Sequence, residues 1–133
     1  MNGAVVRVYS KSKDGSKKLS ANFKVREFAC SDGTDVIFIS EGLVAVLQQI
    51  RSHFGQPVTI NSAYRTVAKN RAVGGATYSQ HLYGLAADIT VRGVAPKDVA
   101  AYAETLLPGT GGIGIYSNFV HIDVRKTKSR WRG

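Results

Sequence analysis

Two histidines and one aspartate in this sequence have the residue types of a catalytic zinc site. His81 lies seven residues before Asp88, with Gly84 between them where the chain can turn, and His121 follows further along the chain. Two neutral imidazoles and one carboxylate form a three-ligand set that leaves one coordination position for water. A plainer interpretation stays open, because a His and an Asp at this spacing often occur by chance and a lone histidine is most often an ordinary surface residue.

The segment around His121 alternates as a half-buried strand does. Its valine and isoleucine side chains fall on one face, which should be the core side, and its chemically active side chains fall on the other. That second face carries Phe119, His121, Asp123 and Arg125. A rise of about 3.3 Å per residue separates His121 and Asp123 by roughly 6–7 Å along the strand, which suits a metal ligand next to a supporting or proton-transfer group.

Residues 85–91 have a second strand pattern, and it presents Asp88. Ala86, Asp88 and Thr90 share one face of this strand. A carboxylate that is buried without a partner costs several kcal/mol, so Asp88 needs hydrogen-bond donors or a cation. A zinc ion would meet that need.

Other elements must hold these two strands in place. Residues 41–54 repeat apolar side chains at helical spacing, with Ser40 placed to cap the helix and Gly55 placed to end it. A second apolar helix is expected from Pro96 to residue 107. Short strands are expected at residues 5–9, 35–39, 57–61 and near 115, and a polar helical piece at residues 66–71. The pattern fits one domain, residues 1–133, with basic ends (1–21 and 126–133) that we expect to be mobile.

The formal net charge of +9 at pH 7 favours polyanionic partners such as nucleic acid, an anionic membrane surface or an anionic cell-wall polymer. The cations concentrate at the two ends of the chain, and such blocks are most often solvated tails. We do not expect nucleic-acid binding, because only Tyr9 and Trp131 offer stacking surfaces near these cations. The single cysteine, Cys30, excludes an internal disulfide and a thiolate zinc site.

The sequence also bears on where the protein acts. No apolar run approaches the length of about 20 residues that a membrane-spanning helix needs, so we expect no membrane insertion. The first residues show no basic segment followed by a long apolar one. No signal peptide is therefore visible, and we expect synthesis in the cytoplasm. We also expect a monomer.

Several motifs follow one another along the chain. They are Asn-Ser-Ala-Tyr-Arg (61–65), Asn-Arg-Ala-Val-Gly-Gly-Ala (70–76), Ser-Gln-His-Leu-Tyr-Gly-Leu-Ala-Ala-Asp-Ile (79–89), Gly-Ile-Gly-Ile-Tyr (112–116) and Phe-Val-His-Ile-Asp (119–123), with Arg130-Trp131 near the end. Together they resemble the peptidase M15 family, over roughly residues 22–132. Within the family, the sequence is most similar to the zinc D-alanyl-D-alanine carboxypeptidase branch, including compact phage-borne and prophage-borne forms.

The resemblance implies that His81, Asp88 and His121 bind one zinc ion. It also implies that Arg65 holds the substrate and offsets the charge of the tetrahedral intermediate, which suits a permanently charged, forked guanidinium. A surface ion pair is the plainer alternative for Arg65. Ser79 is expected to contact the substrate or to support the neighbouring ligand.

The chain departs from the family pattern at the general base. Many relatives carry Glu, Asp or His two or three residues before the second histidine ligand, where this sequence has Phe119 and Asn118. Asp123 is then the candidate base, or it orients His121 as carboxylates commonly do for ligating imidazoles. Tyr116 could assist by donating a hydrogen bond to the oxyanion.

The resemblance implies a small α+β domain, with an antiparallel sheet, flanking helices and a zinc cleft on one face of the sheet. The implied function is zinc-dependent hydrolysis of the stem peptide of peptidoglycan, with D-Ala-D-Ala carboxypeptidase action first and L-alanyl-D-glutamate endopeptidase (endolysin) action second. A non-catalytic wall-binding module on the same fold is a further alternative. In each case we expect action on the bacterial cell wall, where basic ends would help attachment to an anionic polymer.

Overall fold

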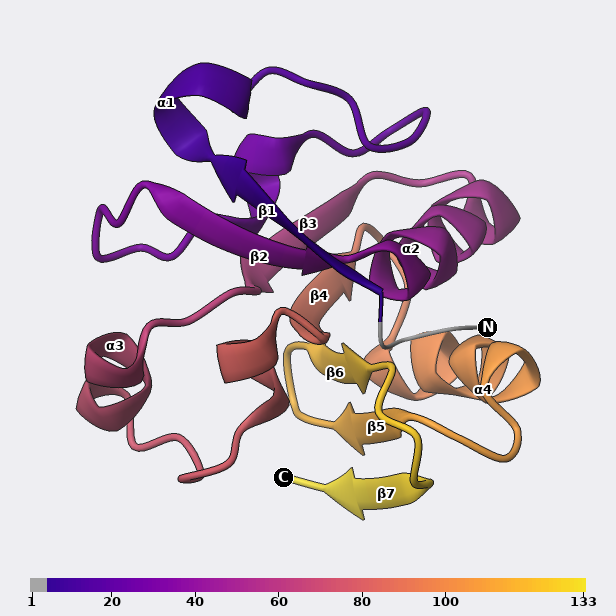
Figure 1. Cartoon of the computed structure of the whole chain (residues 1–133). Helices are drawn as coiled ribbons and strands as arrows, with labels where there is room; N and C mark the ends of the chain where they lie inside the picture. Colours follow the sequence, from indigo (N-terminus) through magenta and orange to yellow (C-terminus); the bar gives the residue numbers. More distant parts are fainter. Residues whose placement is uncertain (1–4) are drawn as a thin grey trace.

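The computed structural model describes residues 5–133 and has a mixed α+β architecture (Figure 1). Its strands are β1 (Val6–Ser10), β2 (Val36–Ser40), β3 (Val58–Ser62), β4 (Ala86–Val91), β5 (Gly112–Ile115), β6 (Val120–Asp123) and β7 (Ser129–Arg132). Its α-helices are α1 (Lys11–Asp14), α2 (Glu41–Phe54), α3 (Val67–Ala72) and α4 (Pro96–Leu106), and its 3-10 helices are η1 (Val25–Phe28) and η2 (Gln80–Tyr83). The α+β class expected from the sequence is confirmed.

The larger sheet has the strand order β3-β4-β6-β5-β7. Neighbouring strands are antiparallel as far as β5, but β7 pairs parallel to β5. The sheet is therefore mixed, and the expectation of a purely antiparallel sheet is wrong at its last strand. A separate two-stranded antiparallel sheet joins β1 to β2.

The C-terminal residues, which we expected to be a mobile basic tail, form the edge strand β7. Arg130 fastens this strand, because its guanidinium pairs with the Glu104 carboxylate at 2.6 Å and donates to the Gly111 carbonyl at 2.6 Å. The sequence Ser-Arg-Trp-Arg of β7 lacks an apolar face. Its charge pattern therefore resembles a solvated tail, although its backbone and its first arginine both have partners.

The N-terminal residues also form more regular structure than we expected. Ser10 ends β1 and caps the single-turn helix α1, its hydroxyl accepting from the Lys13 amide at 3.3 Å. Backbone hydrogen bonds of 3.0 Å then tie Lys17 to Val25 and Gly15 to Arg26. The expectation of a mobile end also covers residues 1–4, which lie outside the described part of the chain.

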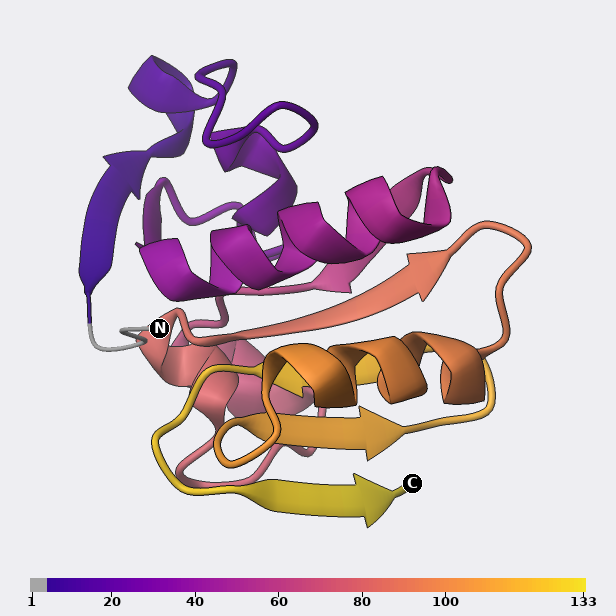
Figure 2. The same cartoon turned by 90° about the vertical axis from the view of Figure 1, so that its right-hand side faces the viewer.

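The helices α2 and α4 pack together on one face of the larger sheet (Figure 2). The hydroxyl of Ser40 accepts from the Leu43 amide at 3.3 Å, and Gly55 ends α2 with a φ of 63°, both as the sequence predicts. The core between helices and sheet is apolar and fully buried; its largest members include Leu43, Leu47, Ile50, Ile89 and Ile122. Alternation along β4 and β6 therefore turns their polar residues to the opposite face of the sheet.

In the part of the chain that the structure describes, no helix combines the length and the apolar character that crossing a bilayer requires.

Candidate metal centre

Asp88 and His121 are brought together by strand pairing. They lie directly opposite each other in the antiparallel pair of β4 and β6, on the face of the sheet away from α2 and α4. Directly opposed residues in such a pair have their side chains close together. The register of two central strands thus positions one imidazole against one carboxylate.

His81 reaches the same point from η2, which leads into β4. The Ser79 hydroxyl caps this turn by accepting from the His81 amide at 3.2 Å. Gly84 ends the turn with a φ of 74°, and a Cβ at this position would lie 2.4 Å from the carbonyl oxygen of Phe38. The turn predicted at Gly84 is present, and only glycine fits there without strain.

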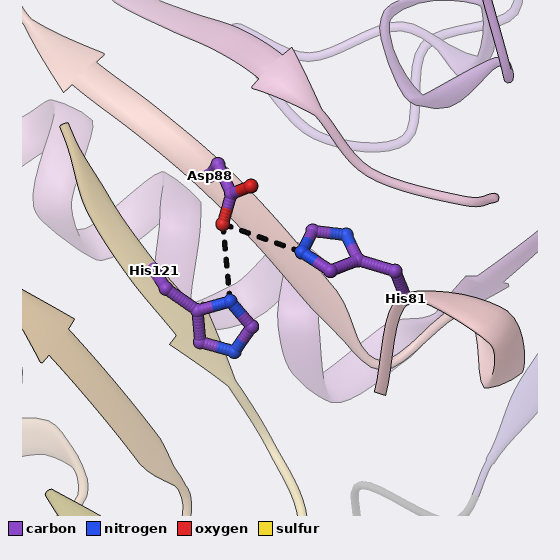
Figure 3. Close-up of side chains that lie close together, drawn as sticks. All are labelled: His81, Asp88 and His121. Carbon is purple, nitrogen blue, oxygen red and sulfur yellow. Dashed lines mark hydrogen bonds and ion pairs between the residues drawn. The ribbon is translucent and has the colours of Figure 1, made fainter. Parts of the chain in front are cut away.

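The three side chains converge in a buried group (Figure 3). The Asp88 Oδ1 atom lies 3.0 Å from His121 Nδ1 and 3.3 Å from His81 Nε2. All three ligand atoms lie within 4.8 Å of one another, and the residues are 8% exposed or less. The arrangement could hold a metal ion.

Each imidazole has a hydrogen-bond partner on the side away from Asp88. His81 Nδ1 lies 2.6 Å from the Ala63 carbonyl oxygen, and His121 Nε2 lies 2.7 Å from Asp123 Oδ2. The Ala63 carbonyl only accepts, so His81 Nδ1 carries hydrogen. His121 faces a carboxylate at both ring nitrogens, since its Nδ1 also lies 3.0 Å from Asp88 Oδ1. A neutral His81 therefore turns its Nε2 lone pair toward Asp88, and His121 does the same with its Nδ1 when its one proton is on the nitrogen that faces Asp123.

Three acceptors that face one another at these distances repel unless a cation or a proton lies between them. Two imidazole nitrogens and one carboxylate oxygen are the donor set that zinc prefers in catalytic sites. A second hydrogen bond on each ring, from a carbonyl or a carboxylate, is also the usual support for a zinc-bound histidine. The residues present therefore fit a zinc ion.

The surroundings keep Asp88 ionised and favour a charge on His121. Burial raises the pKa of Asp88, but its interactions with the His121 and His81 imidazoles outweigh the effect of burial, so the pKa of Asp88 lies below its usual value. Burial lowers the pKa of His121, but its bonds to Asp123 and Asp88 outweigh it and the pKa is raised. Without a metal, His121 thus tends to hold a proton that a metal ion would have to displace.

Arg65 lies beside the group, on the second oxygen of the same carboxylate. Its Nη2 is 3.4 Å from Asp88 Oδ2, its Nε donates to the Ser62 hydroxyl at 3.1 Å, and its Nη1 donates to Asn70 Oδ1 at 3.2 Å. Asn70 is 4% exposed and donates in turn to the Ala76 carbonyl at 2.8 Å. Arg65 is therefore a held cation rather than a loose surface side chain.

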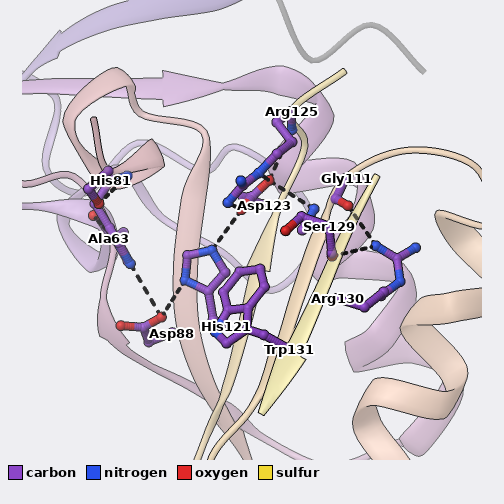
Figure 4. Close-up of polar contacts among 12 residues, drawn as sticks. Ala63, His81, Asp88, Gly111, His121, Asp123, Arg125, Ser129, Arg130 and Trp131 are labelled. Carbon is purple, nitrogen blue, oxygen red and sulfur yellow. Dashed lines mark hydrogen bonds and ion pairs between the residues drawn. The ribbon is translucent and has the colours of Figure 1, made fainter. Parts of the chain in front are cut away.

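Asp123 is surrounded by donors (Figure 4). Its Oδ1 accepts from the Gly112 amide at 2.9 Å and from the amide and Nε of Arg125 at 3.1 and 2.8 Å. Its Oδ2 accepts from His121 and from Arg125 Nη2 at 2.7 and 2.6 Å. Burial raises the pKa of Asp123, but the bonds from His121 and Arg125 outweigh it and hold the pKa below its usual value.

The other two predicted site residues touch the group indirectly. Ser79 contacts the backbone of His81 as a cap. The Tyr116 hydroxyl accepts from Trp131 Nε1 at 2.9 Å, and the Tyr116 ring stacks on Phe119 with centroids 4.4 Å apart. Ser79 thus touches the ligand residue His81 through its backbone, and Tyr116 reaches the ligand residue His121 only through Trp131.

Sequence reasoning missed three contributors to this group: the Ala63 carbonyl, Asn70 and Trp131. Asn70 and Trp131 stand in the motifs that carry the family resemblance, and this was the available signal, although it gave neither residue a role. The Ala63 carbonyl has no signal of its own, because any residue supplies the same oxygen. Only the fold shows which carbonyl faces His81.

The chain is similar in sequence to known peptidases. A family model described as peptidase M15 matches residues 19–123. The chain is 48% identical over 44 residues to a zinc D-Ala-D-Ala carboxypeptidase of Streptomyces albus G, a match that covers 32% of this chain and 17% of that protein. It is 35% identical over 94 residues to the peptidoglycan L,D-endopeptidase MepK of Escherichia coli, a match that covers 64% of this chain and 50% of MepK. The chain thus spans half or less of the length of these relatives.

Proposed function

Since the chain belongs to the peptidase M15 family, we propose that it is a zinc peptidase that hydrolyses the stem peptide of bacterial peptidoglycan. The observation that carries this proposal is the buried His81, Asp88 and His121 group, whose three potential ligand atoms lie within 4.8 Å of one another. The names of both matched relatives, a zinc carboxypeptidase and a peptidoglycan endopeptidase, support the same substrate class. The site of action proposed is the bacterial cell wall.

In this proposal His81, Asp88 and His121 hold the zinc ion, and two further groups orient the two imidazoles. The Ala63 carbonyl fixes the ring of His81, and the Asp123 carboxylate fixes the ring of His121. A bound zinc ion supplies a Lewis acid that lowers the pKa of water and polarises the scissile carbonyl. The pair of fixed rings keeps the ligand geometry ready before the substrate arrives.

Arg65 is proposed to bind the substrate. Its guanidinium is anchored by Ser62 and Asn70 and lies next to the ligand carboxylate. From there it can pair with a carboxylate of the stem peptide and offset negative charge as it develops on the carbonyl oxygen. We propose Ser79 as a further substrate contact, and the Tyr116 hydroxyl, whose hydrogen is not used by Trp131, as a donor to that oxygen.

We assign Asp123 the orienting role rather than the role of general base. A base must accept a proton from water, and its pKa should lie near the working pH. Asp123 already accepts five hydrogen bonds and has a lowered pKa. Its contacts favour support of His121 over proton transfer.

The bond that is cut is a finer proposal. We propose D-Ala-D-Ala carboxypeptidase action, because an arginine beside the metal group suits a substrate that ends in a carboxylate. The longer match to MepK supports endopeptidase action as the second candidate.

Mass spectrometry of muropeptides after digestion with the zinc-loaded protein tests both candidates. Loss of one terminal alanine indicates the carboxypeptidase, and cleavage within the peptide indicates an endopeptidase, including one that cuts after L-alanine. His81→Ala should abolish both, whereas replacement of His53, which stacks on Tyr102 at 3.7 Å, should change neither. A zinc-bound wild-type protein that retains the wall but releases no product would instead indicate a non-catalytic binding module.

A further inference from the structure

The face of the His121 ring is covered by the indole of Trp131. The two ring centroids lie 5.0 Å apart at an angle of 50°. The carboxylates of Asp88 and Asp123 hold the two nitrogens of the imidazole. Trp131 thus packs against the imidazole, as the His81 ring also does at a centroid distance of 5.1 Å, and the His121 side chain is 10% exposed.

Strand register explains how a residue near the end of the chain reaches this ring. Gly114 of β5 lies opposite His121 of β6 on one side and is paired with Trp131 of β7 on the other. The three residues therefore form one row across three adjacent strands. The side chains of His121 and Trp131 lie on the same face of the sheet.

The missing side chain at Gly114 lets the indole cross the middle strand. A Cβ at this position would lie 2.4 Å from both Cε2 and Nε1 of Trp131. Real Cβ atoms do not approach so closely, so any larger residue at position 114 would displace the indole from His121. Glycine here is needed for space rather than for an unusual backbone angle.

Contacts on two further sides hold the indole in place. Its Nε1 donates to the Tyr116 hydroxyl at 2.9 Å, and the Arg125 guanidinium lies 5.5 Å from its ring centroid. Arg125 is the same residue that binds the Asp123 carboxylate. One arginine thus supports both the indole and the Asp123 carboxylate that orients His121.

We propose that Trp131 is a positioning residue for the metal ligand His121, and that β7 is an integral part of the metal centre. The segment matched by the family model ends at residue 123, before Arg125 and Trp131. The proposal rests on the metal site of the proposed function. It adds that the chain after residue 123 sets the affinity of that site.

Zinc affinity, measured by competition with a chromophoric chelator, tests the proposal without any need for activity. Trp131→Ala should raise the Kd for zinc about tenfold or more, the scale expected when a ligand loses its support, and Trp131→Phe should raise it less. Gly114→Ala should also raise the Kd, because it moves the indole while it leaves the tryptophan in the chain. Arg132→Ala is the matched control, since Arg132 is exposed, lies on the same strand and belongs to the other face of the sheet.

Fluorescence gives a second readout, because Trp131 is the only tryptophan in the sequence. One equivalent of Co²⁺ should quench its emission in the wild-type protein and should quench it less in Gly114→Ala. Circular dichroism identifies any variant that fails to fold, and Trp131→Phe and Gly114→Ala then carry the comparison.

The proposal is overturned if folded Trp131→Ala and Gly114→Ala bind zinc as tightly as Arg132→Ala does. It is also overturned if bound Co²⁺ leaves the emission of the wild-type protein unchanged. A wild-type protein that binds no zinc would instead contradict the proposed function, so the two failures are distinguishable.

Discussion

At the scale of single residues, a substitution at Asp123 distinguishes a carboxylate that orients a metal ligand from one that acts as the general base. We expect Asp123→Asn to raise the Kd for zinc about 10- to 100-fold, because His121 loses its charged acceptor. With zinc saturating, kcat should stay close to that of the wild-type protein. A chelator competition assay and a kcat measurement at high zinc give the two values.

The opposite result would identify Asp123 as the general base. In that case kcat would fall by about 10²- to 10⁴-fold, the usual contribution of such a group, while the Kd for zinc would not change. The five hydrogen bonds that the carboxylate accepts argue against that outcome.

Asn70 gives a prediction for the substrate rather than for the metal. Asn70→Ala removes the acceptor of Arg65 Nη1 and should lower kcat/KM about 10- to 100-fold, as expected for a lost hydrogen bond of about 1.5–3 kcal/mol to a charged group. The Kd for zinc should be unchanged. Asn70→Asp, which keeps the acceptor, should restore part of the activity, and Val67→Ala on the exposed side of α3 is the control. Loss of zinc in Asn70→Ala would place its role at the metal instead.

The residue types of the site were predictable from the sequence, but its supports were not. His81, Asp88 and His121 were predicted as ligands because they stand in the ordered motifs that resemble the peptidase M15 family, since their spacing alone often occurs by chance. The contact of the Ala63 carbonyl with His81 and the contacts of Trp131 with His121, Tyr116 and Arg125 depend on how the chain folds. The identities of single residues do not reveal them. Because Asn118 and Phe119 cannot accept a proton usefully, the sequence made Asp123 the candidate base, and the five hydrogen bonds that it accepts favour its other predicted role, the orientation of His121.

At the scale of elements, the two glycines of β5 on the site face each make room for a supporting side chain. Gly114 admits the indole, and a Cβ at Gly112 would lie 2.2 Å from Asp123 Oδ2. We therefore expect Gly112→Ala to weaken zinc binding and to lower the free energy of unfolding by about 1–3 kcal/mol, as overpacking does. Urea titration and chelator competition measure the two effects.

Gly109 is the control for this prediction. A Cβ at Gly109 meets no atom within 4 Å, so Gly109→Ala should leave zinc binding unchanged and could stabilise the fold by up to about 1 kcal/mol. Equal effects of the two substitutions would show that the space at Gly112 has no role in the site.

The junction of β1 and α1 depends on pH through Asp35. Its carboxylate accepts from the Ser10 hydroxyl at 2.6 Å and from the Ser12 amide at 2.8 Å, and these bonds lower its pKa. A carboxyl whose pKa is lower in the folded state stabilises the fold above its unfolded pKa of about 3.9 and loses that contribution as the pH falls through the folded value. Wild type should therefore exceed Asp35→Asn in urea midpoint at neutral pH, and the difference should vanish in acid. A difference that is constant with pH would contradict the prediction.

The elements that the sequence predicted best are those with strong periodicity and clear caps. The helix over residues 41–54 and its boundaries at Ser40 and Gly55 are confirmed, because packing, capping and a left-handed glycine all favour the same segment. β7 was missed because two of its four side chains are arginines and no apolar alternation marks it as a strand. An edge strand of this kind is recognisable only once the sheet is assembled.

At the scale of the whole molecule, two of the cations near the C-terminus, Arg125 and Arg130, have ion-pair partners and do not belong to a free tail. Arg125 binds Asp123 and lies over Trp131, and Arg130 binds Glu104. The composition gives the excess of positive charge but does not tell whether the arginines and lysines lie in a solvated tail or in ion pairs, because the same number of cations fits both. Attachment to an anionic wall polymer stays a prediction for the remaining exposed cations.

Metal binding should also stabilise the whole fold, because the ligands come from η2, β4 and β6 and converge only in the folded chain. Free zinc at about 1,000 times its Kd should add about 4 kcal/mol to the free energy of unfolding. For a chain of this size, that corresponds to a rise in Tm of roughly 10–20 °C. Calorimetry with zinc and with excess chelator measures the shift, and identical Tm values in the two conditions would contradict it.

The measurement that tests the central claim most directly is the zinc content of the purified protein after loading and dialysis. The wild-type chain and His53→Ala, whose histidine lies outside the group, should each retain one zinc ion. His81→Ala and His121→Ala should retain none. A wild-type chain that retains no zinc, or His81 and His121 variants that retain as much as wild type, would contradict the account.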